Sequence, residues 1–320
     1  MNYVNCNKED LEKEYAALVA EYEEVKGKGL KLNMARGKPG EDQLNLSRPL
    51  LDVINSSTDC ITAHGADCRN YGELAGIDEC KNFFAEIFDV DPSDVMVGGN
   101  SSLNMMFDTI AGFMTKPVVE GCKPWYEVKN RKFLCPAPGY DRHFAITEYF
   151  DFDLIPVPMT ENGPDMDVVE KLVENDDSIK GIWCVPKYSN PLGITFSDET
   201  VKRFAALKPA AKDFRIMWDN AYCVHDVTDT PDELLSLMAE CRKTGNVDLP
   251  IMFTSTSKIT FPGSGVAAMA ASDNNMKVIK NRYQYQVISY DKMNMLRHAR
   301  FFGDLNGVKE HMKLHKAVLK

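Results

Sequence analysis

The chain has 320 residues, 44% of them hydrophobic, and a formal net charge of −10. This length and composition are sufficient for a large buried core, and they predict one large domain accompanied by a smaller one. The acidic balance, without any run of basic residues, argues against a nucleic-acid partner. No apolar stretch approaches the ~18 residues that a membrane span needs, and the charged start of the chain is unlike a signal peptide. We therefore expect a cytoplasmic protein.

The cysteines and histidines do not indicate a metal site. The nine cysteines are odd in number, scattered and without a C-x-x-C pair, which is typical of reduced thiols in a cytosolic protein. His311 and His315 have the i, i+4 spacing of two metal ligands on a helix, but no third ligand lies near them in the sequence. We interpret these two histidines as part of a solvated helix face.

Predicted helices and strands alternate along the chain. An amphipathic helix is predicted over 10–26, and a loop opened by Asn70-Tyr71-Gly72 leads into a second helix over 77–88. A short strand over 94–98 ends at two glycines and precedes a helix over 101–114. Six further strand-like runs are bounded by turns: 132–135, 153–157, 181–185, 215–218, 251–254 and 266–270. Helices near 166–174 and 199–207 separate some of these runs.

This alternation predicts an α/β fold with a mostly parallel sheet covered by helices on both faces, a three-layer α/β/α sandwich. In such folds the ligand lies beyond the carboxyl ends of the strands. Polar candidates come just after three of the strand-like runs, and they are Asn190, Asp219 with Tyr222, and Lys258. We expect these side chains to converge at one edge of the sheet.

The residue types at this edge suit a pyridoxal phosphate site. The amine of Lys258 can condense with an aldehyde to give a Schiff base. The carboxylate of Asp219 can keep a pyridine nitrogen protonated, so that the ring accepts electrons. Asn190 and Tyr222 can both donate hydrogen bonds to the phenolic oxygen of the ring. The sequence thus predicts an enzyme that acts on amino acids.

A glycine-rich segment, Gly98-Gly99-Asn100-Ser101-Ser102, leads into the helix predicted over 101–114. Its glycines permit close backbone approach, its hydroxyls can donate hydrogen bonds, and the helix start offers free N–H groups to a phosphate. Alone, the same pattern is also an ordinary helix N-cap. Combined with the polar candidates, it predicts a phosphate site at Ser101 and Ser102.

Two longer motifs resemble those of a known family. They are Ala35-Arg36-Gly37-Lys38-Pro39 near the start and Ser255-Thr256-Ser257-Lys258-Ile259-Thr260-Phe261-Pro262-Gly263 around the lysine. Both are similar to motifs of fold-type-I pyridoxal phosphate enzymes of the class I/II aminotransferase group, and most closely of the divergent bacterial branch of aspartate aminotransferases. The resemblance covers nearly the whole chain, and the motifs keep the order that they have in the family.

The resemblance implies a homodimer that moves an amino group between an amino acid, aspartate or glutamate, and a 2-oxo acid. It implies that Tyr71 reaches the cofactor phosphate of the other subunit, that Tyr140 stacks on the pyridine ring and that His143 supports the aspartate. It also implies that Ser255 and Ser257 help Ser101 and Ser102 to hold the phosphate, while Asn190, Asp219, Tyr222 and Lys258 take the roles argued above.

The substrate contacts are less well defined by the sequence. Arg36, beside Gly37, is a candidate for binding a substrate carboxylate, and a solvated loop charge is an equal alternative. Many family members have an arginine shortly after the lysine motif that clamps the phosphate, but residues 261–268 contain none. We expect hydroxyls and backbone amides to bind the phosphate instead.

The end of the chain differs from the family. Family members continue into a small domain with an arginine that grips the substrate α-carboxylate, whereas this chain stops at Lys320 within a helical pattern, so we expect a fragment. The predicted domains are 1–45, an N-terminal part of the small domain; 46–290, the large cofactor-binding domain; and 291–320, the start of the C-terminal small domain.

Other functions fit parts of the sequence. A truncated cofactor-binding remnant without transaminase activity, or another fold-type-I enzyme such as a β-lyase or decarboxylase, would keep the same residues. The tetrapeptide 255–258 and the tripeptides 272–274 and 243–245 also match the S-x-x-K, S-D-N and K-T-G motifs of serine acyl enzymes, although in the wrong order. A transcription regulator would need a basic DNA-binding module before Leu32, where we predict only an acidic helix.

Overall fold

The chain divides into two compact units, Met1–Gly40 and Glu41–Lys320, and the computed structural model describes residues 3–31 and 37–320. The first unit contains the 3-10 helix η1 (Tyr3–Asn5) and the helix α1 (Lys8–Gly27). Acidic residues in the first turn of α1 suit the positive end of the helix dipole. The helix expected over 10–26 is thus confirmed, and the predicted domain boundaries at 45 and 290 stay a prediction.

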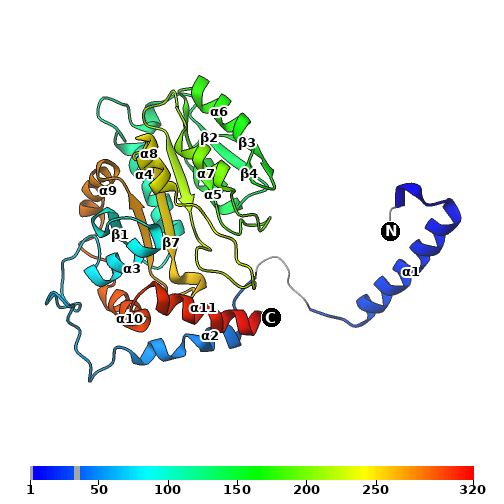
Figure 1. Ribbon diagram of the computed structural model, residues 1–320, viewed down its shortest axis with the longest axis horizontal. Coiled ribbons are helices and arrows are strands. Elements are labelled where there is room, and N and C mark those ends of the chain that lie inside the picture. Colours follow the sequence, from blue (N-terminus) through cyan, green and yellow to red (C-terminus); the bar gives the residue numbers. More distant parts are fainter. Residues whose placement is uncertain (1–2, 32–36) are drawn as a thin grey trace. The chain divides into compact units, whose positions relative to one another are not determined.

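One eight-stranded mixed sheet forms the centre of the second unit (Figure 1). Its strands are β1 (Val95–Val97), β2 (Lys132–Ala137), β3 (Asp153–Thr160), β4 (Gly163–Pro164), β5 (Ile179–Cys184), β6 (Arg215–Asp219), β7 (Pro250–Ser255) and β8 (Ala267–Ala271). The strand order is β1-β8-β7-β6-β5-β2-β3-β4. The strands from β7 to β3 run parallel, whereas β8 is antiparallel to both of its neighbours and β4 is antiparallel to β3. Because β8 is antiparallel to both β1 and β7, β1 points the same way as β7.

Helices precede, connect and follow the strands. The α-helices are α2 (Glu41–Leu46), α3 (Asp78–Phe88), α4 (Ser102–Thr115), α5 (Asp141–Tyr149), α6 (Met166–Asn175), α7 (Asp198–Ala205), α8 (Leu237–Thr244), α9 (Asp273–Gln286), α10 (Lys292–Phe302) and α11 (Leu305–Leu319). The 3-10 helices of this unit are η2 (Arg48–Asp52), η3 (Pro92–Asp94), η4 (Trp125–Glu127) and η5 (Thr256–Lys258).

Both faces of the sheet are buried, and successive residues of a strand enter different cores. In β6, Ile216 and Trp218 belong to one hydrophobic cluster, while Met217 between them belongs to the other. The first cluster is completed by side chains of α3, α6, α7, α8, α10 and α11, and the second by α4, α5 and α9. Alternation of this kind places helices on both sides of one sheet. The predicted three-layer α/β/α fold is therefore confirmed.

The central strands form because their sequences are apolar on both faces. Every residue of β5, β6, β7 and β8 is buried, which explains why these strands appear as continuous hydrophobic runs rather than alternating ones. No helix in residues 3–31 and 37–320 combines the length and the apolar character that crossing a membrane requires.

Candidate functional site

Five strands deliver polar segments to one edge of the sheet. β5, β6 and β7 are neighbouring parallel strands, so that the segments after Cys184, Asp219 and Ser255 leave the sheet on the same side. The carboxyl ends of β1 and β2 lie at this edge as well, because β1 points the same way as β7 and β2 is parallel to β5. The sheet order therefore places the segment with Asn190, the segment with Lys258 and the glycine-rich loop at the same edge of the sheet.

Asp219, the last residue of β6, is a buried carboxylate with one satisfied oxygen. Its Oδ2 atom lies 2.9 Å from Nε2 of His143, which follows β2 in α5. The His143 ring stacks on Trp183, with centroids 4.7 Å apart and planes 15° apart, and Tyr140 packs edge-on against it at 5.0 Å. The other oxygen, Oδ1, is buried and has no hydrogen-bond partner in the described part of the chain. A buried acceptor without a donor is uncommon, so this atom marks a position where a donor is expected.

Lys258 and Tyr222 face each other at the same edge. Lys258 lies in η5, directly after β7, and its Nζ is 4.6 Å from the centroid of the Tyr222 ring. Burial raises the pKa of Tyr222, the nearby Asp219 carboxylate raises it further, and the Asn190 side chain opposes the rise. The Tyr222 hydroxyl therefore keeps its proton at neutral pH and can donate a hydrogen bond.

The glycine-rich loop after β1 is tied to the lysine loop. The Gly98 N–H donates to the Ala267 carbonyl at 2.7 Å, and the Ser257 hydroxyl donates to the Asn100 carbonyl at 2.8 Å. Ser101 is the N-cap of α4, but its side chain makes no capping hydrogen bond. The start of α4 thus has backbone N–H groups, and a hydroxyl that does not cap them, at the edge where Lys258 lies.

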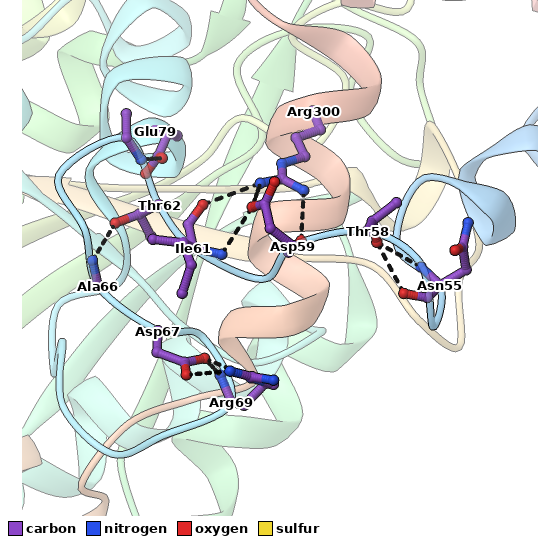
Figure 2. Close-up of polar contacts among 11 residues, drawn as sticks. Asn55, Thr58, Asp59, Ile61, Thr62, Ala66, Asp67, Arg69, Glu79 and Arg300 are labelled. Atoms are coloured by element: carbon purple, nitrogen blue, oxygen red, sulfur yellow. Dashed lines mark hydrogen bonds and ion pairs between the residues drawn. The ribbon is translucent and has the colours of Figure 1, made fainter.

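Tyr71 lies in the long loop before α3, and its side chain is 81% exposed. This loop is fixed to α10 by polar contacts (Figure 2): the Arg300 guanidinium donates to the Asp59 carboxylate at 2.6 Å and to the carbonyls of Asp59 and Ile61 at 2.9 and 3.1 Å. Lys292, also from α10, donates to the Gly72 carbonyl at 3.1 Å. The loop is held in place while the tyrosine ring points into solvent.

The structure does not test the two predicted substrate residues. Arg36 lies outside the described residues, and Gly37 is an exposed residue of the unit Met1–Gly40. The roles predicted for these two residues stay predictions.

The three serine acyl enzyme motifs do not converge. Ser255 ends β7 and Lys258 follows it, whereas Ser272 follows the antiparallel β8 and bonds to Asp248, just before β7 begins. The K-T-G segment caps the end of α8, where Thr244 donates to the Ala205 carbonyl. A shared S-x-x-K, S-D-N and K-T-G site is therefore absent from this part of the chain.

The interpretation of His311 and His315 as a solvated helix face is wrong. Both side chains are buried, with exposures of 6% and 4%, on the side of α11 that also buries Val308 and Met312. These four positions have the i, i+3, i+4, i+7 spacing of a buried helix stripe, which was the signal that could have revealed them. Their Nε2 atoms lie against the Ile259 carbonyl, one residue after Lys258.

Cavity volume alone does not identify the site. A cavity of about 590 Å³ lies between α4 and α9, and none of the predicted site residues lines it. Within the described residues, the His, Cys, Asp and Glu side chains form no group of three or more that could hold a metal ion.

Comparisons with known proteins agree with the fold and with the predicted family. The family profile described as aspartate amino-transferase matches residues 6–320. An aspartate aminotransferase of Corynebacterium glutamicum is 43% identical over 298 residues, which are 93% of this chain and 68% of the relative. The crystal structure of an aspartate transaminase from C. glutamicum superposes with a TM-score of 0.93 at 40% identity, covering 98% of this chain and 73% of the other. The α-aminoadipate aminotransferase LysN of Thermus thermophilus, solved with N-(5'-phosphopyridoxyl)-L-leucine, shares the fold at 18% identity and a TM-score of 0.64, covering 87% of this chain and 65% of that one.

Proposed function

The chain belongs to the aspartate aminotransferase family, and we propose that it is a pyridoxal phosphate-dependent enzyme that transfers the amino group of aspartate or glutamate to a 2-oxo acid. The observation that carries the proposal is the unpartnered Oδ1 of Asp219. A protonated pyridine nitrogen is a cationic donor of the kind that this buried carboxylate lacks. The residues present therefore fit the cofactor.

The bound cofactor would supply a ring that accepts electrons from the α-carbon of the amino acid. The side chains of this chain would bind the cofactor, position it and transfer the proton. Lys258 would hold the cofactor covalently and, when released, would move a proton between the α-carbon and the cofactor. Asp219 would keep the ring nitrogen protonated, and His143 would hold the carboxylate in place through the 2.9 Å contact.

Four hydroxyl groups and a helix start would bind the phosphate. Ser101 is the N-cap of α4 and Ser102 its first residue, while Ser255 ends β7 and Ser257 lies in η5. The Ser257–Asn100 hydrogen bond holds these two segments together. This arrangement supports the expectation that hydroxyls and backbone amides replace the arginine that the lysine motif lacks.

Around the ring, Tyr140 would stack on one face, while Asn190 and Tyr222 would donate hydrogen bonds to the phenolic oxygen. The hydroxyl of Tyr222 is protonated at neutral pH for the reason given above. Aspartate and glutamate are proposed as donors because the C. glutamicum relative is described as an aspartate aminotransferase.

A half-reaction tests the proposal. The purified protein, loaded with pyridoxal phosphate, is mixed with one amino acid at a time and without any 2-oxo acid. Aspartate or glutamate should convert the cofactor to pyridoxamine phosphate with release of an equal amount of the matching 2-oxo acid, measured by chromatography. Release of ammonia or carbon dioxide without pyridoxamine phosphate would instead identify a β-lyase or a decarboxylase. Cofactor binding without any conversion would identify a binding remnant.

We also propose that the site is shared across a homodimer, with Tyr71 donated by the other subunit. The exposed ring on a fixed loop supports this arrangement, because an 81% exposed tyrosine contributes little to its own subunit. Mixing Tyr71→Phe and Lys258→Ala chains should restore activity, since one site of each mixed dimer then has both native residues. Random exchange at equal amounts should give about a quarter of the native activity.

The matched control for this mixing experiment is Tyr126→Phe, which removes the hydroxyl of a 58% exposed tyrosine in η4. This variant should keep native activity. A monomer in sedimentation equilibrium that still binds the cofactor tightly would contradict the shared site, as would mixed dimers without any recovered activity.

A further inference from the structure

Four of the six histidines of the chain surround the turn that contains the predicted Schiff-base lysine, and we call them the histidine cluster: His225, His298, His311 and His315. They come from three separate segments, which are the loop after β6, the helix α10 and the helix α11. None of the four takes part directly in the proposed reaction.

The histidine cluster contacts residues 258–260, the turn that contains Lys258. The contacted atoms are the carbonyl oxygens of Lys258 and Ile259 and the side chain of Thr260. His225 has its Nε2 atom 3.2 Å from the carbonyl oxygen of Lys258. His298 has its Nε2 atom 3.1 Å from Oγ1 of Thr260, and its Nδ1 atom 2.9 Å from the Asn294 carbonyl of its own helix. The lysine itself and the second residue after it are thus each contacted by a histidine.

Ile259, between Lys258 and Thr260, is contacted by two histidines. His311 and His315 have their Nε2 atoms 3.2 and 3.0 Å from the carbonyl oxygen of Ile259. Ser47, which follows α2, adds its hydroxyl at 3.4 Å from the same oxygen and 3.1 Å from His311. The Ile259 carbonyl therefore has two imidazole nitrogens and one hydroxyl within hydrogen-bond distance, more partners than one backbone acceptor needs.

The protonation state of these imidazoles follows from their partners. A carbonyl oxygen only accepts, so the Nε2 atoms of His225 and His315 carry hydrogen and donate to it. The Nε2 atom of His311 lies between the Ile259 carbonyl, to which it can donate, and the Ser47 hydroxyl, from which it can accept. Burial lowers the pKa of His225 and of His311 to about 4. At neutral pH the cluster thus supplies uncharged donors to the backbone. A lysine or arginine in the same positions would put a second positive charge beside Lys258.

We infer that the histidine cluster positions Lys258: it fixes the backbone of residues 258–260, so that the lysine amine reaches its working position without reorganisation in each turnover. The inference rests on the proposed function of Lys258. The four histidines are positioning residues, because their hydrogen bonds are made with residues 258–260, with Ser47 and with the Asn294 carbonyl of α10. A displacement of about 1 Å at a reacting group can cost about 100-fold in rate.

The double variant His311→Leu/His315→Leu tests the inference, because it removes both imidazoles from the Ile259 carbonyl. We expect kcat of the cofactor-loaded enzyme to fall about 10- to 100-fold, with little change in KM for the amino acid. The pH at which the visible band of the bound cofactor titrates should shift. In the cofactor-free protein, the amides around residues 256–262 should exchange hydrogen faster. Each single variant should have a small effect, so that the double variant loses more than the product of the two.

Two further variants serve as rescue and control. His311→Gln/His315→Gln keeps an amide N–H close to the position of each Nε2, and it should regain most of the native kcat and band titration. His64→Leu removes an imidazole that is 70% exposed and is paired with Asp78 on the surface, and it should behave as the native protein.

The outcomes separate positioning from a merely structural role. A lower melting temperature with native kcat and native band titration would overturn the inference. Should the double leucine variant fail to fold, His225→Leu, which removes the one imidazole donor to the Lys258 carbonyl, takes its place; native kcat and titration in that variant would equally overturn it. Borohydride labelling of Lys258 in the native protein tests the proposed function independently. A failure of the positioning inference can therefore be distinguished from a failure of the proposed role of Lys258.

Discussion

Replacing Lys258 with alanine is expected to abolish both turnover and the covalent attachment of pyridoxal phosphate. The lysine follows β7 at the edge where Asp219 and the start of α4 also lie, and its amine is 4.6 Å from the Tyr222 ring. Alanine has no amine to form the bond or move the proton, and a positioned proton-transfer group alone contributes about 10²- to 10⁴-fold in rate. We therefore expect kcat to fall by at least that factor.

The measurement is borohydride reduction of the loaded protein followed by peptide mass mapping. The native protein should carry the reduced adduct on Lys258, and Lys258→Ala should carry none and should lack the visible band. Lys277→Ala is the matched control, since Lys277 is an exposed lysine with a surface ion pair to Asp273. An adduct on Lys187, which is buried and paired with Asp226, would show that a different lysine holds the cofactor.

The central sheet could be predicted from the sequence because its strands are buried on both faces. The runs expected over 181–185, 215–218 and 251–254 correspond to β5, β6 and β7, each within two residues at either end. The direction of a strand has no comparable signal in its composition. For this reason the sequence did not reveal that β8 runs antiparallel to β7, nor that this reversal brings the loop after β1 to the site.

Several helices were not predicted, and their sequences explain why. No helix was expected over α5, α8 or α9. α8 has only eight residues, and most residues of α9 are polar or charged, so that the apolar stripe that marks an amphipathic helix is weak. In α5 only one of the buried side chains, Ile146, is apolar, while His143 and Thr147 are polar, so the sequence shows no apolar stripe there.

The convergence of Lys258, Asp219 and the glycine-rich loop at one edge could be predicted because each follows an apolar run, and the carboxyl ends of parallel strands meet at one edge. The histidines that contact the turn around Lys258 could not be predicted in this way. His225 comes from the loop after β6, and His311 and His315 come from α11, more than fifty residues after the lysine they surround. Such contacts depend on how helices pack, for which a single sequence gives no direct pattern. The lack of a third metal ligand near His311 and His315 was taken to indicate a solvated face, although histidine is intermediate in burial, and this led to the wrong interpretation of α11.

Replacing Asp219 with alanine is expected to lower kcat far more than replacing Tyr222 with phenylalanine. Asp219→Ala removes the buried carboxylate that would hold the proton on the ring nitrogen, and it leaves His143 without its 2.9 Å partner. Removing a preorganised electrostatic partner costs about 10²- to 10³-fold in rate. Tyr222→Phe removes one hydrogen bond, worth about 0.5–1.5 kcal/mol, or about 1.5–3 kcal/mol if its acceptor is charged.

The comparison is made on kcat of variants that bind the cofactor to the same extent, with His143→Gln as a third member of the series. That variant can keep a donor to Oδ2 of Asp219, so that it should lie between the other two. The absorbance of the bound cofactor provides a second measurement, because loss of the carboxylate should favour the unprotonated ring nitrogen and Tyr222→Phe should not. Equal activities of Asp219→Ala and Tyr222→Phe would mean that another residue keeps the ring protonated, and the unpartnered oxygen of Asp219 would then need a different donor.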